Sequence, residues 1–354
     1  MKIAFLSFYS GRIDRGVEVA TAALAKRLSK THEITLFQAG ETLVPGINTV
    51  CVDTQDAWPQ DTSQSWWRWF YLDYYSRKIG KFTWKFLPYL LRHRYDVVVP
   101  TNGGWQIVLL RIATWLLKKK LVVGGNAGIG RDDAWQLEWR PDHYIAISPE
   151  GYEWAKKKHP SASISFIPYG VDLEIFAKAK PHIVNLSKPI VLSVAAFIPL
   201  KRIDLLIRAM EKVPEASLLV IGQGPLEKEL RELGQKLLGD RFLLKTGVGH
   251  SELIGFYKAV DVFSLPSKSS EAFGIVYVEA LGAGLPIVAT DDDNRRKIIS
   301  EAGIYVNPQD TELYAEAIKK ALNSNLKKKA LIQAKKYSWD GISKQYEQLL
   351  QMLV

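Results

Sequence analysis

The stretch PSKSSEAFGIVYVEALGAGLPIVATD, residues 266–291, holds the residue types best suited to chemistry. An apolar run before it predicts a buried strand, and its own pattern predicts a polar loop and then a helix that begins near Phe273. The first N–H groups of such a helix can bind a diphosphate, and Gly274 would let the backbone approach it. Further along the helix, the carboxylate of Glu279 could accept both hydroxyls of a ribose. The competing interpretation is that Glu271 and Glu279 are two exposed glutamates on an amphipathic helix.

Two other positions could meet phosphate. Lys201 and Arg202 follow the first apolar run of the second half of the chain. A cation there, if shielded from water, could neutralise the charge that develops on a departing phosphate. Gly16 opens the first helix-like segment, and it too would let an anion come close to the backbone. The competing interpretations are a solvated basic pair and a glycine that merely starts a helix.

Other binding signatures are incomplete in this sequence. Gly222 and Gly224 follow an apolar run, but Glu227 stands where the dinucleotide pattern requires its third glycine. No P-loop sequence occurs, and none of the six histidines has metal-ligand spacing. Nicotinamide and P-loop chemistry are therefore disfavoured, and we predict neither a cofactor nor a protein-held metal.

The elements that must position these residues alternate along the whole chain. Short apolar runs typical of buried parallel strands alternate with amphipathic stretches at helical spacing, which predicts an α/β fold. A first series of predicted strands covers residues 2–7, 33–37, 97–100, 121–123, 144–147 and 165–167. A second series covers residues 190–195, 217–221, 242–245, 262–265 and 287–290. The pattern dissolves over residues 177–188, which we interpret as a linker between two doubly wound parallel sheets.

The composition is that of a soluble, folded chain with two domains. Its 354 residues exceed one ordinary core, and 47% of them are apolar while 24% are charged. Cys51 stands alone, so no internal disulfide is possible, and we find neither a signal segment nor an apolar run of membrane-spanning length. We therefore expect a cytoplasmic protein. The net charge of +10 suits an anionic partner, although many soluble proteins are equally basic.

Residues 76–94, SRKIGKFTWKFLPYLLRHR, predict a basic amphipathic helix that Pro88 would bend or shorten. At helical spacing one face holds Ile79, Phe82, Phe86 and Leu90, and another holds Lys78, Lys81, Lys85 and Arg92. The aromatic residues that precede it are Trp66, Trp67, Trp69, Phe70 and Tyr71. Such a helix can lie in the surface of an anionic bilayer. The competing interpretation is a helix that packs its apolar face on the first sheet.

Six segments, in order, resemble those of the retaining glycosyltransferases of family 4, the glycosyl transferases group 1. They are RGVEVATAALAKRLSKTHEITLF, SFIPYGVDLEIF, IGQGPLEKEL, FYKAVDVFSLPS, EAFGIVYVEALGAGLPIVATD and the final stretch 337–353. The resemblance covers nearly the whole chain and implies the GT-B fold, in which two Rossmann-like domains face each other across a cleft. It implies an acceptor-side domain over residues 1–180, a donor-binding domain over 181–335 and a helix over 336–354 that crosses back to the first domain.

The resemblance also implies roles for particular residues. Glu271 would contact the donor sugar near the reacting carbon, Lys201 would neutralise the leaving diphosphate, and Glu279 would hold the ribose. Further donor contacts would come from Gly16, Phe273, Gly274 and Ile275, of which Gly274 and Ile275 would act through backbone N–H groups. In this family such groups take the place of a metal ion.

Two segments depart from the family pattern. Ala195 and Ala196 stand where many members have Gly-Arg, so the second phosphate cation is missing from its usual place and Arg202 is the candidate substitute. The loop GGNAGIGRDD places Asn126 near the position where members often carry a histidine. Asn126 is therefore the candidate contact to the acceptor or the sugar.

We therefore predict a metal-independent, retaining hexosyltransferase that moves a sugar from a UDP- or GDP-sugar to a hydroxyl acceptor, such as a lipid-linked or polysaccharide precursor. The acceptor would attack on the face that the nucleotide leaves, and the departing phosphate oxygen would take its proton, so no protein base is needed. We expect an anionic membrane surface, at the inner face of the membrane, as a further partner, and no nucleic acid. Two alternatives stay open: a nucleotide-sugar epimerase, and a catalytically silent sugar-nucleotide binding subunit, which Ala196 would favour.

Overall fold

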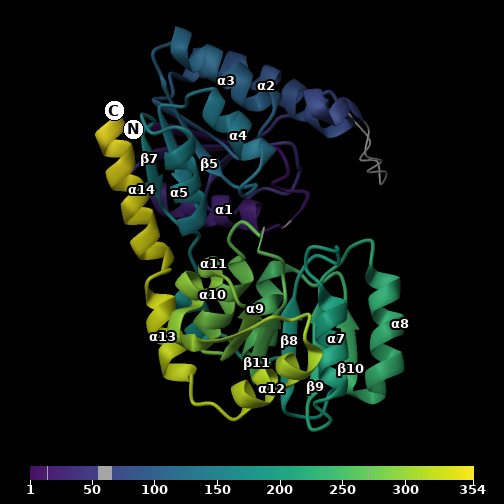
Figure 1. Ribbon diagram of the computed structural model, residues 1–354. Coiled ribbons are helices and arrows are strands. Elements are labelled where there is room, and N and C mark those ends of the chain that lie inside the picture. The colour runs from purple at the N-terminus through teal and green to yellow at the C-terminus, as the bar shows by residue number, and fades with distance from the viewer. Residues whose placement is uncertain (14, 55–65, 270) are drawn as a thin grey trace. The chain divides into compact units, whose positions relative to one another are not determined.

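The computed structural model describes residues 1–13, 15–54, 66–269 and 271–354, and only the backbone of residues 66 and 67 (Figure 1). The chain forms two compact units, of which unit 1 consists of Met1–Pro168 and Asp340–Val354 and unit 2 of Tyr169–Trp339. Helix α6 (Leu173–Lys178) belongs to unit 2, whereas the expected division at residue 180 assigned it to the first domain. The cause is packing, because Phe176 is buried and lies in van der Waals reach of Gly282 in α10 (Ile275–Ala283).

Unit 1 contains a parallel seven-stranded sheet with the order β3-β2-β1-β4-β5-β6-β7 (Figure 1). The strands are β1 (Lys2–Ser7), β2 (Glu33–Gln38), β3 (Asn48–Cys51), β4 (Val97–Pro100), β5 (Lys120–Gly125), β6 (His143–Ala146) and β7 (Ile164–Phe166). The helices are α1 (Gly16–Leu28), α2 (Tyr74–His93), α3 (Trp105–Leu116), α4 (Arg131–Glu138), α5 (Pro149–Lys158), α14 (Trp339–Leu353) and the 3-10 helix η1 (Trp66–Phe70).

Unit 2 contains a parallel six-stranded sheet with the order β10-β9-β8-β11-β12-β13. The strands are β8 (Ile190–Val194), β9 (Ser217–Ile221), β10 (Phe242–Lys245), β11 (Val262–Leu265), β12 (Ile287–Thr290) and β13 (Gly303–Val306). Besides α6 and α10, the helices are α7 (Ile203–Glu211), α8 (Glu227–Leu238), α9 (His250–Ala259), α11 (Asp293–Ile299), α12 (Thr311–Leu322), α13 (Lys327–Lys335), η2 (Gly239–Arg241) and η3 (Ser300–Ala302).

Both sheets are doubly wound, which confirms the predicted fold class. The two strands that the sequence did not predict, β3 and β13, are edge strands with partly exposed residues. The strand order reverses between β1 and β4 and between β8 and β11. Open α/β sheets bind ligands beyond the carboxyl ends of their strands at such a point. In unit 2, the loops after β8 and β11 carry Lys201 and Glu271 there.

Helix α2 packs its apolar face into the core of unit 1. The buried residues of this face are Ile79, Phe82, Phe86 and Leu90. This confirms the packed-helix interpretation and leaves no such stripe for a bilayer. On the basic face, Lys81 Nζ donates to the main-chain oxygen of Thr54 at 3.1 Å, and Lys85 Nζ donates to that of Asp53 at 2.6 Å. Among the helices described, none has the length and apolarity that a membrane span requires.

Candidate functional site

The loop that follows β11 leads into α10 and carries the predicted donor residues. Gly274 is the N-cap of α10 and has φ +80°, in the left-handed region that favours glycine. A side chain there would also collide, since a Cβ would lie 2.6 Å from the ring of Tyr277. The first two N–H groups of α10, those of Ile275 and Val276, have no preceding helical turn to bond to and are available to an anion, whereas that of Tyr277 donates to the main-chain oxygen of Gly274 at 2.9 Å.

Phe273 lies in the core of unit 2. Its side chain is 2% exposed and meets the rings of Tyr169 and Tyr337 edge-on, at centroid separations of 5.8 and 6.0 Å. The aromatic side chain therefore anchors the loop. The sequence predicted Phe273 as a contact to the donor. Because its side chain is buried in the core, only its backbone could make such a contact.

Glu271 and Lys201 lie together at the carboxyl ends of β11 and β8. Lys201 Nζ donates a hydrogen bond to Glu271 Oε1, and both side chains are largely buried. Burial alone would raise the pKa of Glu271, but the Lys201 ammonium and the Arg295 guanidinium, 3.6 Å from Oε2, hold that pKa below its usual value. Glu271 is therefore ionised at neutral pH in a site that is mostly shielded from water.

Arg295 of α11 is a second cation at this site. Its side chain is fully buried and donates hydrogen bonds to the main-chain oxygens of Lys268, at 2.8 Å, and Ser269, at 3.3 Å. It also pairs with Asp292 at 2.9 Å. Arg295 therefore fixes the loop that precedes Glu271 and adds positive charge beside the Glu271 carboxylate.

Arg202 supports the same loop from the other side. Its Nε donates to the main-chain oxygen of Pro266 at 2.7 Å. Its Nη2 donates to the main-chain oxygen of Ser267 at 3.0 Å and to Thr290 Oγ1 at 3.1 Å. These bonds to protein groups argue against the predicted role of Arg202 as the substitute phosphate cation.

Glu279 is buried in α10 and bonded to residues of α9. Its Oε1 lies 2.7 Å from His250 Nε2, and its Oε2 accepts a hydrogen bond from the Tyr257 hydroxyl at 2.8 Å. Burial and the adjacent carboxylate raise the pKa of Tyr257 well above its usual value, so this hydroxyl remains a donor. A carboxylate oxygen has two lone pairs, so each can accept a further hydrogen bond. The interpretation of Glu271 and Glu279 as two exposed glutamates is therefore wrong.

Four buried polar atoms of this site have no hydrogen-bond partner within the described residues. They are Ser267 Oγ, Glu271 Oε2, Asn294 Oδ1 and Arg295 Nε. Buried polar atoms are nearly always hydrogen-bonded in folded proteins. Their concentration around one loop indicates a site that receives a polar ligand.

Gly16 and Asn126, the two other predicted site residues, belong to unit 1. Gly16 is the first residue of α1 and follows β1 in the chain. Asn126 follows β5, and its Nδ2 lies 3.4 Å from the main-chain oxygen of Thr101. Both residues therefore lie in connections that leave the carboxyl edge of the unit 1 sheet.

Asp133 of α4 holds the loop that carries Asn126. Its carboxyl is 3% exposed, and Oδ1 accepts a hydrogen bond from the backbone N–H of Ala127 at 3.2 Å. Burial raises the pKa of Asp133 to about 7, and the hydrogen bonds from Ala127 and Tyr144 offset only part of that shift. The unit 1 edge therefore contains a buried carboxyl that is partly protonated near neutral pH.

Gly222 permits close packing between two loops of unit 2. A Cβ at this position would lie 1.8 Å from the main-chain oxygen of Ala195, and Phe197 N donates to the main-chain oxygen of Gln223 at 2.8 Å. This contact between the loops after β9 and β8 explains why glycine stands at position 222, although the third glycine of the dinucleotide-binding pattern is missing.

Sequence reasoning missed Arg295, His250 and Tyr257. Arg295 lies in the polar stretch DDDNRRK, where nothing marks it out, and its exposed neighbour Arg296 looks equivalent in the sequence. His250 is 29 positions from Glu279 and meets it only because α9 packs beside α10. Over the described part of the chain, no group of three His, Cys, Asp or Glu side chains is arranged to hold a metal ion.

The sequence matches two protein families. Residues 175–338 match the family described as "Glycosyl transferases group 1", and residues 15–175 match "Glycosyltransferase Family 4". The two matches meet at residue 175, near the boundary between the units, and together they span most of the chain.

Two curated relatives illustrate the range of similar proteins. A GDP-mannose-dependent monoacylated alpha-(1-6)-phosphatidylinositol monomannoside mannosyltransferase of Corynebacterium glutamicum is 26% identical over 220 residues, which cover 54% of this chain and 57% of that protein. A sulfoquinovosyl transferase of Arabidopsis thaliana is 32% identical over 162 residues, 43% of this chain and 31% of that protein. The chain thus spans about half the length, or less, of the curated relatives it matches.

Solved structures match over the full length. HepE of Anabaena, in complex with UDP and glucose, has a TM-score of 0.77 and 18% identity, with 99% of this chain and 100% of that chain covered. WaaG, a glycosyltransferase involved in lipopolysaccharide biosynthesis, has a TM-score of 0.71 and 16% identity, with 98% and 99% covered. At these identities the likeness shows the fold, which is the GT-B architecture of two Rossmann-like domains.

Proposed function

Because the chain belongs to glycosyltransferase family 4, we propose that it transfers a sugar from a nucleotide diphosphate sugar to a hydroxyl acceptor with retention of configuration. The observation that carries this proposal is the shielded Lys201–Glu271 pair, which lies next to the start of α10. A cation, a carboxylate and free helix N–H groups suit a leaving diphosphate and a reacting sugar. The Corynebacterium relative is named for GDP-mannose and HepE was solved with UDP-glucose, which supports a UDP- or GDP-sugar as donor.

In this proposal the diphosphate lies at the N-terminus of α10, where Ile275 and Val276 offer N–H groups. Lys201 neutralises the charge that grows on the phosphate oxygen as the bond to the sugar carbon breaks. Glu271 holds Lys201 in place through Oε1. Its Oε2 lies 3.6 Å from Arg295, has no hydrogen-bond partner among the described residues and is available to a sugar hydroxyl. Such preorganised charges act strongly because the site is mostly shielded from water.

Retention follows if both bonds change on one face of the sugar. The acceptor oxygen forms a bond to the anomeric carbon on the side from which the phosphate leaves. The proton of the acceptor hydroxyl passes to the departing phosphate oxygen. The step is balanced without a protein base, and no described residue of unit 2 is required to accept that proton.

Glu279 is proposed to hold the ribose of the donor. His250 and Tyr257 fix the carboxylate, and each oxygen retains a lone pair for a ribose hydroxyl. A contact of this kind is equally strong in the ground state and in the transition state. It therefore contributes to donor affinity and little to the rate of the chemical step.

We propose further that transfer needs no divalent cation. Lys201, Arg295 and the start of α10 supply positive charge on the unit 2 side of the site. If this is correct, a chelator such as EDTA leaves the initial rate unchanged within about twofold, and a rate restored only by added Mg²⁺ or Mn²⁺ contradicts the proposal.

One observation favours a second candidate, a catalytically silent binding subunit. Ala196 stands where many family members have arginine, and the Arg202 guanidinium is bound to protein groups instead. Such a subunit would bind the nucleotide sugar without turning it over.

Two measurements test the proposed function. A thermal-shift screen against UDP-, GDP- and ADP-sugars identifies the donor, since a ligand that binds only the folded state raises the melting temperature. Release of free sugar from that donor, without acceptor, then separates the candidates. A transferase leaks free sugar, whereas a donor that binds and is never hydrolysed or transferred supports the silent subunit.

We propose that the acceptor is lipid-linked and that the protein works in the cytoplasm, bound peripherally to anionic lipid at the inner face of the membrane. Since the apolar stripe of α2 is buried, contact would come from its exposed side, where Trp84 and Leu91 are 65% and 62% exposed beside Arg92 and Arg94. Each basic residue near an anionic surface contributes about 1 kcal/mol. Co-sedimentation with anionic vesicles at low salt, lost at high salt, is the expected result, and no binding at low salt contradicts it.

A further inference from the structure

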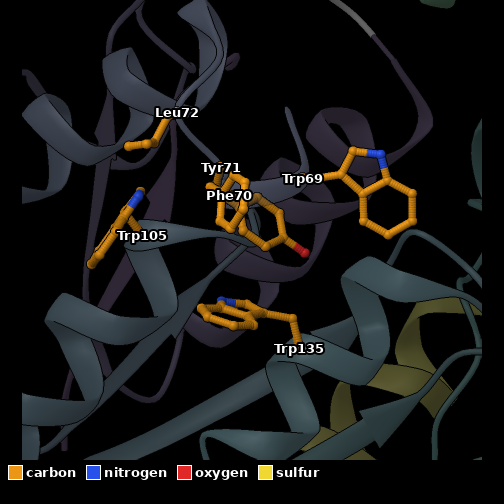
Figure 2. A pocket seen from close by; sticks show the side chains of 6 residues that line it. All are labelled: Trp69, Phe70, Tyr71, Leu72, Trp105 and Trp135. Carbon is orange, nitrogen blue, oxygen red and sulfur yellow. The ribbon is translucent and has the colours of Figure 1, made fainter. Parts of the chain in front are cut away.

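Unit 1 contains an aromatic pocket that none of the roles above uses. The cavity has a volume of about 500 Å³, within the usual range of small-molecule sites. Its walls are Trp69, Phe70, Tyr71, Leu72, Trp105 and Trp135. Figure 2 shows the rings of Phe70, Tyr71 and Trp135 gathered on one side and Trp105 and Leu72 on another.

Two of the polar groups in the walls, the Tyr71 hydroxyl and Trp135 Nε1, are already bonded within unit 1. The Tyr71 hydroxyl donates to Asp132 Oδ1 at 2.9 Å, and Trp135 Nε1 donates to the main-chain oxygen of Gly104 at 3.1 Å. What Tyr71 and Trp135 present to the cavity is therefore ring faces. A sugar or a peptide would leave its own polar groups without partners here, whereas an apolar occupant would not.

The walls are held in place by the backbone. Gly104 precedes α3 with φ +61°, and a Cβ there would lie 2.9 Å from the Tyr71 ring, so only glycine lets this ring lie against the chain. The Tyr71 and Trp135 rings pack with their centroids 5.2 Å apart. Tyr71 and Trp135 thus form a fixed wall of the pocket, while the other wall residues, Trp69, Phe70, Leu72 and Trp105, are partly exposed.

A cation lies beside the apolar walls. The Arg131 guanidinium is 4.4 Å from the centroid of the Tyr71 ring and 5.1 Å from that of the Trp69 ring. Its Nη2 also donates to the main-chain oxygens of Arg68 and Trp69. Positive charge at the margin of an apolar cavity complements an amphiphile with an anionic head and a hydrocarbon tail.

The position in the fold connects this pocket with the acceptor. Trp105 begins α3, after β4, and Trp135 lies in α4, after β5 and the loop that contains Asn126. The pocket is therefore built from connections at the carboxyl edge of the unit 1 sheet, the edge at which Asn126 also lies.

We propose that this pocket binds the hydrocarbon chain of an anionic lipid acceptor, with Arg131 facing the charged head. The proposal rests on the proposed transfer function, whose acceptor it assigns to a chemical class. Binding of the chain places the acceptor at the unit 1 edge and adds affinity in proportion to the buried chain length. Each buried methylene contributes up to about fourfold in affinity.

The test is calorimetric titration of the full chain with dodecyl phosphate and with hexyl phosphate, below their micelle concentrations. Dodecyl phosphate should bind at least tenfold more tightly than hexyl phosphate. Trp105→Ala should lower the affinity for dodecyl phosphate at least tenfold. Trp115→Ala is the matched control, because Trp115 lies in the same helix, is 69% exposed and is not part of the pocket wall.

A second variant covers the case in which Trp105→Ala fails to fold. Leu72→Glu places a carboxylate at the wall of the pocket, where the side chain is partly exposed, and should also abolish binding of dodecyl phosphate. Equal affinity for the two chain lengths, or equal loss in the Trp105 and Trp115 variants, overturns the proposal. Equal affinity for dodecyl phosphate and the neutral dodecyl maltoside overturns the role of Arg131.

Donor hydrolysis, measured in the same variants, separates this proposal from the transfer function. If the Trp105 and Leu72 variants release sugar from the donor as the parent does while they lose dodecyl phosphate, the pocket is an acceptor site. If no protein, parent included, hydrolyses or transfers the donor while dodecyl phosphate binds to the pocket, the transfer function fails and the lipid site stands alone.

Discussion

Glu271 in unit 2 and Asp133 in unit 1 are both largely buried carboxyls at the carboxyl edge of a parallel sheet, yet their pKa values move in opposite directions. Lys201 and Arg295 hold the pKa of Glu271 below its usual value against the effect of burial. Burial raises the pKa of Asp133 to about 7, since backbone and tyrosine donors only partly compensate for it. The same fold therefore holds one buried carboxyl ionised and the other partly protonated near neutral pH.

The comparison shows that the sheets set the place of the sites, and that the loops and helices that follow the strands set their chemistry. In unit 2 these segments bring two cations to one carboxylate, which suits a phosphorylated donor. In unit 1 they bring aromatic rings and a partly protonated carboxyl, which suits an acceptor with an apolar part.

The largest effect is expected from removal of Arg295. Arg295→Ala leaves Glu271 Oε2 and Asp292 without their buried cation and two main-chain oxygens without donors. Breaking a buried ion pair costs about 3–5 kcal/mol, so the free energy of unfolding measured in urea should fall by that amount. Arg296→Ala is the control, because Arg296 forms an exposed pair with Asp291 that is worth at most about 1 kcal/mol. Equal losses in both variants would show that the unit 2 edge does not depend on buried charge.

The second effect is on catalysis. Lys201→Ala should lower turnover by roughly 10²- to 10³-fold, the usual cost of one preorganised group that stabilises developing charge. Lys212→Ala provides the control, because Lys212 lies at the end of the adjacent helix and pairs with Glu312 on the surface. Turnover within about threefold of the parent would remove Lys201 from the mechanism.

The third prediction concerns the neutral carboxyl of unit 1. Asp133 ionises near pH 4 in an unfolded chain and near pH 7 in the folded one. Between these values the folded chain keeps a proton that the unfolded chain has lost. Asp133 therefore makes folding less favourable as the pH rises, by about 1.4 kcal/mol for each pH unit.

His143 has the opposite effect in the same pH range. Burial lowers the pKa of His143 to about 4, so the unfolded chain gains a proton first as the pH falls. The two effects oppose each other in the parent, and the informative quantity is the difference between Asp133→Asn and the parent. As the pH rises from 5 to 6.5, the free energy of unfolding of the variant, measured by urea denaturation, should increase by about 2 kcal/mol relative to that of the parent. A constant difference across this range would mean that Asp133 is ionised in the folded protein.

The sequence was sufficient for elements that carry a strong local pattern. The buried strands of both sheets and the start of α10 near Gly274 follow from continuous apolar runs and from a glycine before a helix. The edge strands β3 and β13 are only four residues long and partly exposed, and both were missed, although β13 carries an apolar run at residues 304–306. Among the predicted site residues, Lys201 and Glu271 lie in the loops after β8 and β11, and Glu279 lies in α10.

Contacts between elements could not be predicted from local patterns. Arg295 and Arg296 are adjacent and chemically alike, and only the packing of α11 decides that Arg295 is buried while Arg296 is exposed. His250 meets Glu279 through helix packing over a long separation in the sequence. The aromatic pocket joins residues of η1, α3 and α4, which no single stretch of sequence brings together.

The smallest effect should come from the ribose contact. Glu279→Ala should raise the Michaelis constant for the donor by roughly tenfold and change turnover by less than about threefold, because this contact is the same in the ground state and the transition state. Glu252→Ala, an exposed glutamate of α9, is the control for loss of one negative charge. Tyr257→Phe adds a finer test, since it removes one donor to Oε2 and leaves the carboxylate in place. Its Michaelis constant should rise less than that of Glu279→Ala. A large fall in turnover at saturating donor in Glu279→Ala would mean that this carboxylate acts in the chemical step, and the division between a binding glutamate and the Lys201–Glu271 pair would be wrong.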